Sequence, residues 1–224
     1  MSQQYEPGTS QRTEQPAQSD RPARGAPAES PQPAPAAPVE TLFPTRSYLP
    51  QEVRATSIGA LDQTLADLSA ISMQLRSAHW NVKGQEFYQL HELFEDLIEA
   101  FDAAIDEVAE RVSTLGGRPS GTAREVASTT TIPALPRETV EGTALVAELA
   151  DRLAILDANL YEQLELVSAR NDRDTADLVN EVSRTVSKSL WLLEAHLQSG
   201  PSAGGGGQPA QVSGPSPNSQ RPMQ

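Results

Sequence analysis

The sequence predicts an all-α fold, a four-helix bundle with one long internal connection and a tail at each end. Three observations carry this prediction. Four long segments place large apolar residues at three- and four-residue spacing, the period of an amphipathic helix. The second and third of these segments are separated by about 20 residues, which is long enough for one connection to span a bundle. Both ends of the chain carry almost no large apolar residues.

The terminal segments differ in composition from the rest of the chain and are predicted to be disordered tails. Residues 1–49 are rich in Pro, Gln, Ala and Ser, and residues 199–224 include four consecutive glycines. The bundle is therefore assigned to residues 50–198. The chain has a net charge of −13, and the tails carry −1 and +1, so the whole −13 falls on the bundle. Neither tail is a basic arm.

The residue types bound the chemistry and the compartment. The chain has no cysteine, which excludes a disulfide framework, a thiolate metal site and a cysteine nucleophile. No apolar run approaches the roughly 18 residues of a membrane span. The N-terminus lacks the basic and then apolar stretches of a secretory signal. These features favour a cytoplasmic protein without a membrane partner.

Residues 51–83 are predicted to form the first long helix. Pro50 suits its start, because the first helical N–H groups have no partner in any case. His79 then lies in the last turn, close to the second helix. The apolar positions at helical spacing are Val53, Ile58, Leu61, Leu65, Leu68, Ile71, Leu75 and Val82.

The second helix is predicted over residues 87–115, where Gly116 and Gly117 end it. The connection that follows, residues 118–137, contains a possible short helix at residues 122–127. The apolar stripe of the second helix consists of Leu90, Phe94, Phe101, Ile105 and Val108.

Two further helices are predicted after the connection, over residues 139–169 and 174–198. Asp174 suits the N-cap of the last helix, and Trp191 is expected in the core. The apolar positions are Leu145, Leu149, Leu153, Leu156, Leu160, Leu164 and Val167, followed by Val179, Val182, Val186, Leu190, Leu193 and Leu197.

A group of histidines and carboxylates points to metal chemistry. His with Asp or Glu is a ligand set that suits iron, zinc or manganese. On the second helix, Glu95, Asp106 and Glu110 lie within about 100° of His91, on one stripe. His79 adds a second imidazole from the first helix. The alternative is a solvated acidic face, but two of the three histidines in register with three carboxylates favour a metal site.

This stripe is too long to form one metal site within one chain. Glu95 and Asp106 are separated by about 16 Å of helix rise, whereas the ligands of one ion lie about 2 Å from it. An antiparallel two-fold copy of the helix would set Asp106 and Glu110 of one subunit against His91 and Glu95 of the other. The sequence therefore predicts a metal site shared between subunits and present twice in each dimer.

The same stretch resembles the Dps family, the mini-ferritins. The family pattern reads His-Trp-Asn-Val-x-Gly-x-x-Phe-x-x-Leu-His, with Asp four residues later, then Asp-x-x-x-Glu-Arg and Gly-Gly. One position departs, because Glu95 stands where the family usually has Asp and carries its carboxylate on one more methylene. The matching residues are His79, Trp80, Gly84, Phe87, Leu90, His91, Asp106, Glu110, Arg111, Gly116 and Gly117.

The resemblance covers about residues 50–198 and implies a ferritin-like four-helix bundle whose short extra helix helps to form a dimer interface. It also implies a hollow homo-oligomer, a dodecamer built from dimers, that protects against oxidative damage. Such a shell oxidises Fe(II), preferably with hydrogen peroxide and otherwise with oxygen, and stores ferric mineral. The implied iron ligands, which zinc can also occupy in vitro, are His79, His91, Glu95, Asp106 and Glu110.

In that family the start of the last bundle helix lines acidic three-fold pores through which iron enters. The resemblance therefore implies a pore role for Asp172, Asp174 and Asp177. Helix capping is the simpler explanation for Asp174.

Three other functions compete with this interpretation. A di-iron site inside the bundle, as in large ferritins, needs Glu-x-x-His, and the chain has no such motif. A DNA-compacting protein needs cations to neutralise phosphates, whereas this chain has only Lys83 and Lys188 as lysines and near-neutral tails, so DNA binding is predicted to be weak. The third is a metal-free structural assembly, which only Glu95 favours.

Overall fold

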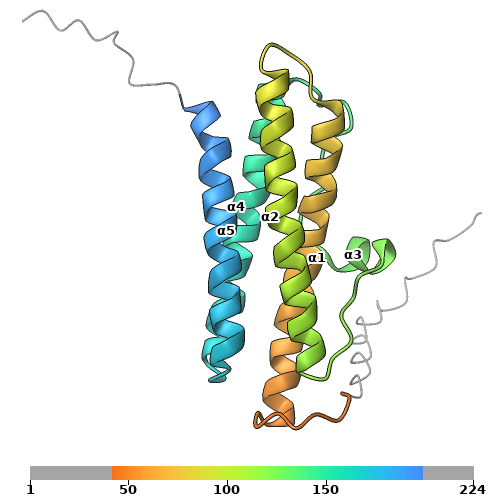
Figure 1. The fold of residues 1–224 in the computed structure, drawn as a ribbon, viewed down its shortest axis with the longest axis vertical. Coiled ribbons are helices and arrows are strands. Elements are labelled where there is room, and N and C mark those ends of the chain that lie inside the picture. The colour runs from red at the N-terminus through yellow and green to blue at the C-terminus, as the bar shows by residue number, and fades with distance from the viewer. Residues whose placement is uncertain (1–41, 199–224) are drawn as a thin grey trace, which may run out of the picture. The chain divides into compact units, whose positions relative to one another are not determined.

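The computed structural model describes residues 42–198, so the predicted disorder of residues 1–41 and 199–224 lies outside the described range. Within that range the protein is all-helical, as predicted, and no helix is long and apolar enough to cross a membrane. Each predicted helix is present, with ends shifted by a few residues. The helices are α1 (Gln51–Asn81), α2 (Phe87–Thr114), α3 (Ala123–Thr129), α4 (Gly142–Ser168) and α5 (Arg173–Leu197) (Figure 1).

The four long helices form two antiparallel pairs, α1 with α2 and α4 with α5 (Figure 1). The start of α4 is tied to the turn between α1 and α2. There the backbone N of Lys83 donates to Val140 O at 2.7 Å, and the N of Gly142 donates to Lys83 O at 3.0 Å. Helices α2 and α4 therefore begin at the same end and run in the same direction, as the long connection predicts.

The core lies between the four long helices and contains the apolar stripes predicted for them, except Leu197 at the end of α5, which is 38% exposed. Phe94 and Phe101 of α2 are its largest fully buried side chains. The prediction that Trp191 lies in the core is wrong, because 59% of this residue is exposed. Leu193 is buried and Leu190 packs against the core in this part of α5, and Trp191 is rotated from Leu190 by about 100°.

The packed region begins before the predicted boundary at residue 50. Leu49 is buried, and the backbone N of Phe43 donates to Gly116 O at 2.8 Å. Gly116 has φ +87°, and a Cβ atom there would lie 2.6 Å from Phe43 O. The glycine therefore both ends α2 and allows the preceding segment to pass close to it.

Buried charged side chains hold the connection between α2 and α4 against the bundle. Asp67 of α1 is fully buried and accepts hydrogen bonds from the Thr130 hydroxyl at 2.8 Å and the Thr131 backbone N at 2.7 Å. Arg152 of α4 donates to the backbone oxygens of Pro133 and Ala134. These bonds satisfy backbone groups that have no helical partner.

Candidate metal centre

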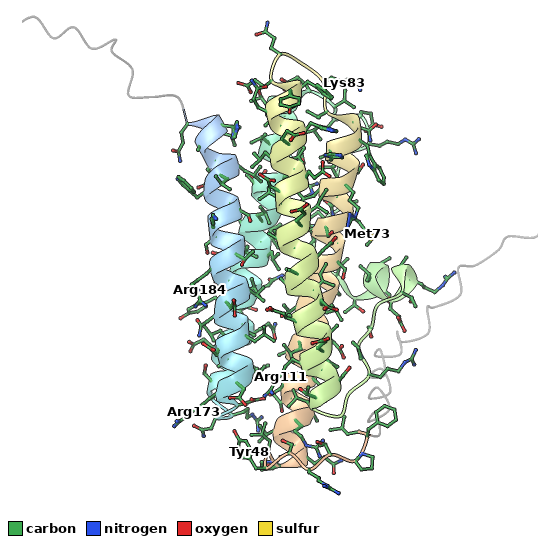
Figure 2. The ribbon with its side chains drawn as sticks, viewed as in Figure 1. Tyr48, Met73, Lys83, Arg111, Arg173 and Arg184 are labelled. Atoms are coloured by element: carbon green, nitrogen blue, oxygen red, sulfur yellow. The ribbon has the colours of Figure 1, made fainter. Side chains whose placement is uncertain are left out.

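The turn between α1 and α2 brings the two predicted histidines together. His79 lies in the last turn of α1, and His91 lies in the second turn of α2. Between them Gly84 has φ +121°, a backbone conformation that glycine adopts far more readily than other residues, so the chain can reverse direction there. Figure 2 labels Lys83 in this turn, at one end of the bundle.

Hydrogen bonds across the turn hold both imidazole rings. Nδ1 of His79 lies 2.9 Å from the backbone O of His91, and Nδ1 of His91 lies 3.0 Å from the backbone O of His79. Because a carbonyl oxygen can only accept, each Nδ1 carries the proton and donates it. In the neutral form of each ring Nε2 then carries the lone pair with which an imidazole binds a metal ion.

Ring stacking also holds the two imidazole rings in place. The centroids of the two imidazole rings are 3.8 Å apart with an interplanar angle of 18°. The ring of Phe87 stacks on His91 with a centroid distance of 5.3 Å. The nitrogen donors are therefore positioned by three aromatic rings and two hydrogen bonds, which limits the rearrangement that metal binding requires.

Glu95 adds a carboxylate to the histidine pair. Its Oε2 lies 3.9 Å from Nε2 of His79, and its side chain is 58% exposed. One donor atom from each of His79, His91 and Glu95 lies within 4.8 Å of the other two, the only such group of three or more potential ligands in residues 42–198. Two neutral nitrogens and one carboxylate suit first-row divalent metals such as Fe(II) and Zn(II).

The two remaining predicted ligands lie elsewhere in the same chain. Asp106 and Glu110 are exposed residues farther along α2, toward the end that Arg111 marks in Figure 2. The helix rise from Glu95 to Asp106 is about 16 Å, so these carboxylates cannot reach the histidine pair of their own chain. Their exposure leaves them accessible to a second chain, and their role as ligands stays a prediction.

The predicted pore residues separate into one buried and two exposed carboxylates. The N-cap of α5 is Asp172 and not Asp174, because the helix begins at Arg173 and the Asp172 side chain accepts from the Thr175 backbone N. Asp172 is fully buried, which leaves its carboxylate inside the chain and argues against its predicted pore role. Asp174 and Asp177 are exposed, and a pore role for them stays a prediction.

Asp172 joins three helices at this end of the bundle. Its carboxylate accepts from the Ser57 and Thr175 hydroxyls, each at 2.7 Å, and from Nη2 of Arg111 at 2.9 Å. Burial raises the pKa of the Asp172 carboxyl, whereas these hydrogen bonds and the Arg111 charge together lower it by more. The pKa of Asp172 therefore lies below its ordinary value. The network fixes α5 against α1 and α2.

We expect Asp172→Ala to lower the free energy of unfolding by about 3 kcal/mol at neutral pH, since it removes the nearest carboxylate of the largely buried Arg111 side chain and the acceptor of the Ser57 and Thr175 hydroxyls. Because the folded-state pKa is depressed, this stabilisation is present at neutral pH and is lost as the pH falls through that pKa. Chemical denaturation across the acid range measures both effects. Asp174→Ala is the control, because Asp174 is exposed and lies 3.9 Å from Nη1 of Arg111; an equal loss in the control would contradict the account.

Comparison with known sequences identifies relatives along the whole bundle. The family model for a ferritin-like domain matches residues 58–203. A protein of Agrobacterium fabrum called DNA protection during starvation protein is 34% identical over 154 residues, which are 69% of this chain and 95% of the relative.

Solved structures give the same result. DpsC from Streptomyces coelicolor superimposes with a TM-score of 0.69 and 31% identity, over 72% of this chain and 94% of that one. The Dps protein of Vibrio cholerae O1 superimposes with a TM-score of 0.64 and 30% identity, over 67% of this chain and 94% of that one. It is described as a member of a broad superfamily of ferritin-like diiron-carboxylate proteins. These matches cover most of the chain and nearly all of each relative, and the chain therefore belongs to the Dps family of ferritin-like proteins.

Proposed function

We propose that this protein oxidises Fe(II) and stores the ferric product as a mineral inside a closed homo-oligomer. The observation that carries this proposal is the group formed by His79, His91 and Glu95, with both Nε2 atoms presenting lone pairs. The description of the Vibrio cholerae relative as a diiron-carboxylate protein supports it. Iron is here the substrate and the stored material.

The residues of the group divide the chemistry between them. The imidazoles bind Fe(II) without adding charge, whereas carboxylates favour the higher charge of Fe(III) and so lower the cost of losing an electron. With hydrogen peroxide as the oxidant, two Fe(II) ions each give up one electron. One peroxide molecule takes up both electrons and two protons and leaves as two waters. Dioxygen is the second candidate oxidant.

A second copy of the chain supplies the other carboxylates in this proposal. A two-fold axis crossing the paired α2 helices would place Asp106 and Glu110 of one copy beside His91 and Glu95 of the other. The midpoints of these pairs are separated by about 22 Å of helix rise, so the two metal sites of a dimer would stand roughly 20 Å apart. Six such dimers would form the dodecamer implied by the family resemblance.

The proposal is tested by adding Fe(II) without oxygen and then supplying peroxide or air in separate samples. We expect ferric absorbance to rise faster than in protein-free buffer, and faster with peroxide than with air. Native mass spectrometry of the same sample should show a closed oligomer. A stable monomer, or oxidation no faster than in buffer, would overturn the proposal.

DNA binding is the second candidate, because the Agrobacterium fabrum relative is named for DNA protection. The charge of −13 on the bundle and the near-neutral tails oppose approach to phosphates. We expect no shift of duplex DNA in a gel at submicromolar protein, moderate salt and neutral pH without divalent ions. A clear shift would contradict this, unless deletion of residues 1–45 removed it and so assigned it to the arginines of that segment.

A further inference from the structure

A polar pocket of about 370 Å³ lies between the last turns of α1 and the segment that leads into α4, toward the end of the bundle where Figure 2 labels Lys83. Its volume falls within the range of sites that hold small molecules. Among the described residues, its lining includes one cationic side chain and no carboxylate. We propose that this pocket binds a small oxyanion, a molecule that presents a carboxylate or phosphate group. The polar lining residues are Ser77 and Asn81 of α1 and Arg137 and Thr139 of the connection.

The pocket is separate from the histidine group. Ser77 and Asn81 stand two residues before and two residues after His79, so each is rotated from it by about 160° around α1. His79 faces α2, where its Nδ1 bonds the backbone O of His91. The pocket therefore lies on the opposite side of α1, and none of its lining residues is a predicted iron ligand. A molecule bound there would contact a different set of side chains from the iron.

Hydrogen bonds hold both ends of the pocket wall that residues 135–139 form. Before this wall, Arg152 of α4 donates to the backbone O of Ala134 at 2.6 Å. After it, the backbone N of Lys83 donates to Val140 O at 2.7 Å. Because both ends are anchored to the bundle, the pocket is formed before a ligand arrives, and binding requires little further ordering of the backbone.

The polar side chains of the pocket retain free hydrogen-bonding groups. Within residues 42–198, the Arg137 guanidinium and the hydroxyls of Ser77 and Thr139 make no hydrogen bond or ion pair. Asn81 donates one N–H to Ser77 O at 2.8 Å, which leaves its side-chain oxygen and its second N–H. A guanidinium presents a planar fork of N–H donors that matches two oxygens of a carboxylate or phosphate. The two hydroxyls can donate to the remaining oxygens.

Charge distinguishes this pocket from the rest of the bundle. Residues 50–198 carry a net charge of −13, which repels anions over most of the surface. An exposed arginine is by itself an ordinary solvated side chain, and Arg137 is exposed. Its neighbour Glu138 does not line the pocket and makes no ion pair with it. The guanidinium therefore combines an anchored wall, facing hydroxyls and freedom from a competing carboxylate, which together suit an oxyanion.

Isothermal titration calorimetry of the full-length assembled protein tests this site, with inorganic phosphate and succinate as probes in separate titrations. Iron is first removed by reduction and chelation, because iron ions bind both anions by themselves. Chloride sets one ionic strength in every solution, so that screening by salt is equal throughout. Binding of either probe supports the site, and the preferred probe shows whether a phosphate or a carboxylate group is the better ligand.

We expect saturable binding to the wild type and an affinity at least about tenfold weaker in Arg137→Gln, because a hydrogen bond to a charged group contributes about this factor. Thr139→Val removes one hydroxyl while keeping the shape of the side chain, and should weaken binding by about threefold. Arg124→Gln is the matched control, because Arg124 is an exposed arginine of α3 that does not line the pocket. The control should retain the wild-type affinity.

The inference is overturned if neither probe binds the wild type, or if Arg137→Gln binds as tightly as the wild type does. An equal loss of affinity in Arg124→Gln and Arg137→Gln would also overturn it, since diffuse charge would then explain the binding. Arg137→Gln should oxidise Fe(II) at the wild-type rate, because the pocket lies across α1 from the histidine group, so the site is tested independently of the proposed function. Circular dichroism and native mass spectrometry confirm that each variant folds and assembles.

Discussion

Replacing both site histidines, His79→Ala with His91→Ala, should lower the initial rate of peroxide-driven Fe(II) oxidation by at least about 100-fold, because loss of even an outer partner of a ligand costs 10- to 100-fold. The variant loses every nitrogen donor of the group and leaves Glu95 as its only member. Neither imidazole belongs to the apolar core, which is formed by the stripes of the four long helices. The bundle and its assembly should therefore persist.

The initial rate of ferric absorbance after a peroxide addition measures this effect. His196→Ala is the matched control, because it replaces the third histidine, which is exposed in the last turn of α5 and bonds Leu192 O through Nδ1. We expect the control to oxidise iron at the wild-type rate. If the double variant does so as well while retaining its helical content, the oxidation site lies elsewhere.

Local patterns were sufficient to predict the helices and the histidine pair. The leucine and valine spacing gave the four long helices, because burial of one face is the same requirement that the bundle imposes. Gly116 located the end of α2, where the structure shows a positive φ. The spacing of His91 and Glu95, one turn apart, placed both on one face of α2, and the position of His79 in the last turn of the first helix placed it close to the second.

Contacts between distant residues could not be predicted in this way. Ser57 and Asp172 are 115 residues apart, and no local pattern pairs them. The capping preference of aspartate fitted Asp174 as well as Asp172, and only the contacts with α1 and α2 distinguish them. Trp191 was misplaced because its size favours burial, whereas its position on α5 is set by its neighbours.

The sequence also could not predict the hydrogen bonds that each histidine makes to the backbone oxygen of the other. The residue types indicated a metal site, but the tautomers depend on which carbonyl each Nδ1 meets. The placement of Asp106 and Glu110 against a second chain is likewise a matter of assembly, so one chain cannot reveal it. A metal site shared between two chains can be tested with two kinds of chain in one assembly.

Asp106→Asn with Glu110→Gln should, in a homogeneous assembly, reduce peroxide-driven oxidation about as strongly as the histidine double variant does, by at least about 100-fold. The cause of the loss differs from that in the histidine variant. Here the group of His79, His91 and Glu95 is intact, and the negative charge of the partner's carboxylates is missing. Each double variant alone is then nearly inactive. Their mixture is expected to behave differently, because the two sets of lost residues come from different halves of a shared site.

Co-assembly of the two double variants tests the shared site most directly. In a two-fold dimer of one chain of each kind, one site combines both defects and the other combines the intact histidines of one chain with the intact carboxylates of its partner. Random pairing would therefore restore about a quarter of all sites. We predict that the co-assembled protein regains oxidation in this proportion, measured against wild type at equal chain concentration. If the mixture stays as inactive as either parent while mass spectrometry confirms mixed assemblies, each site is built within one chain and the shared-site account is wrong.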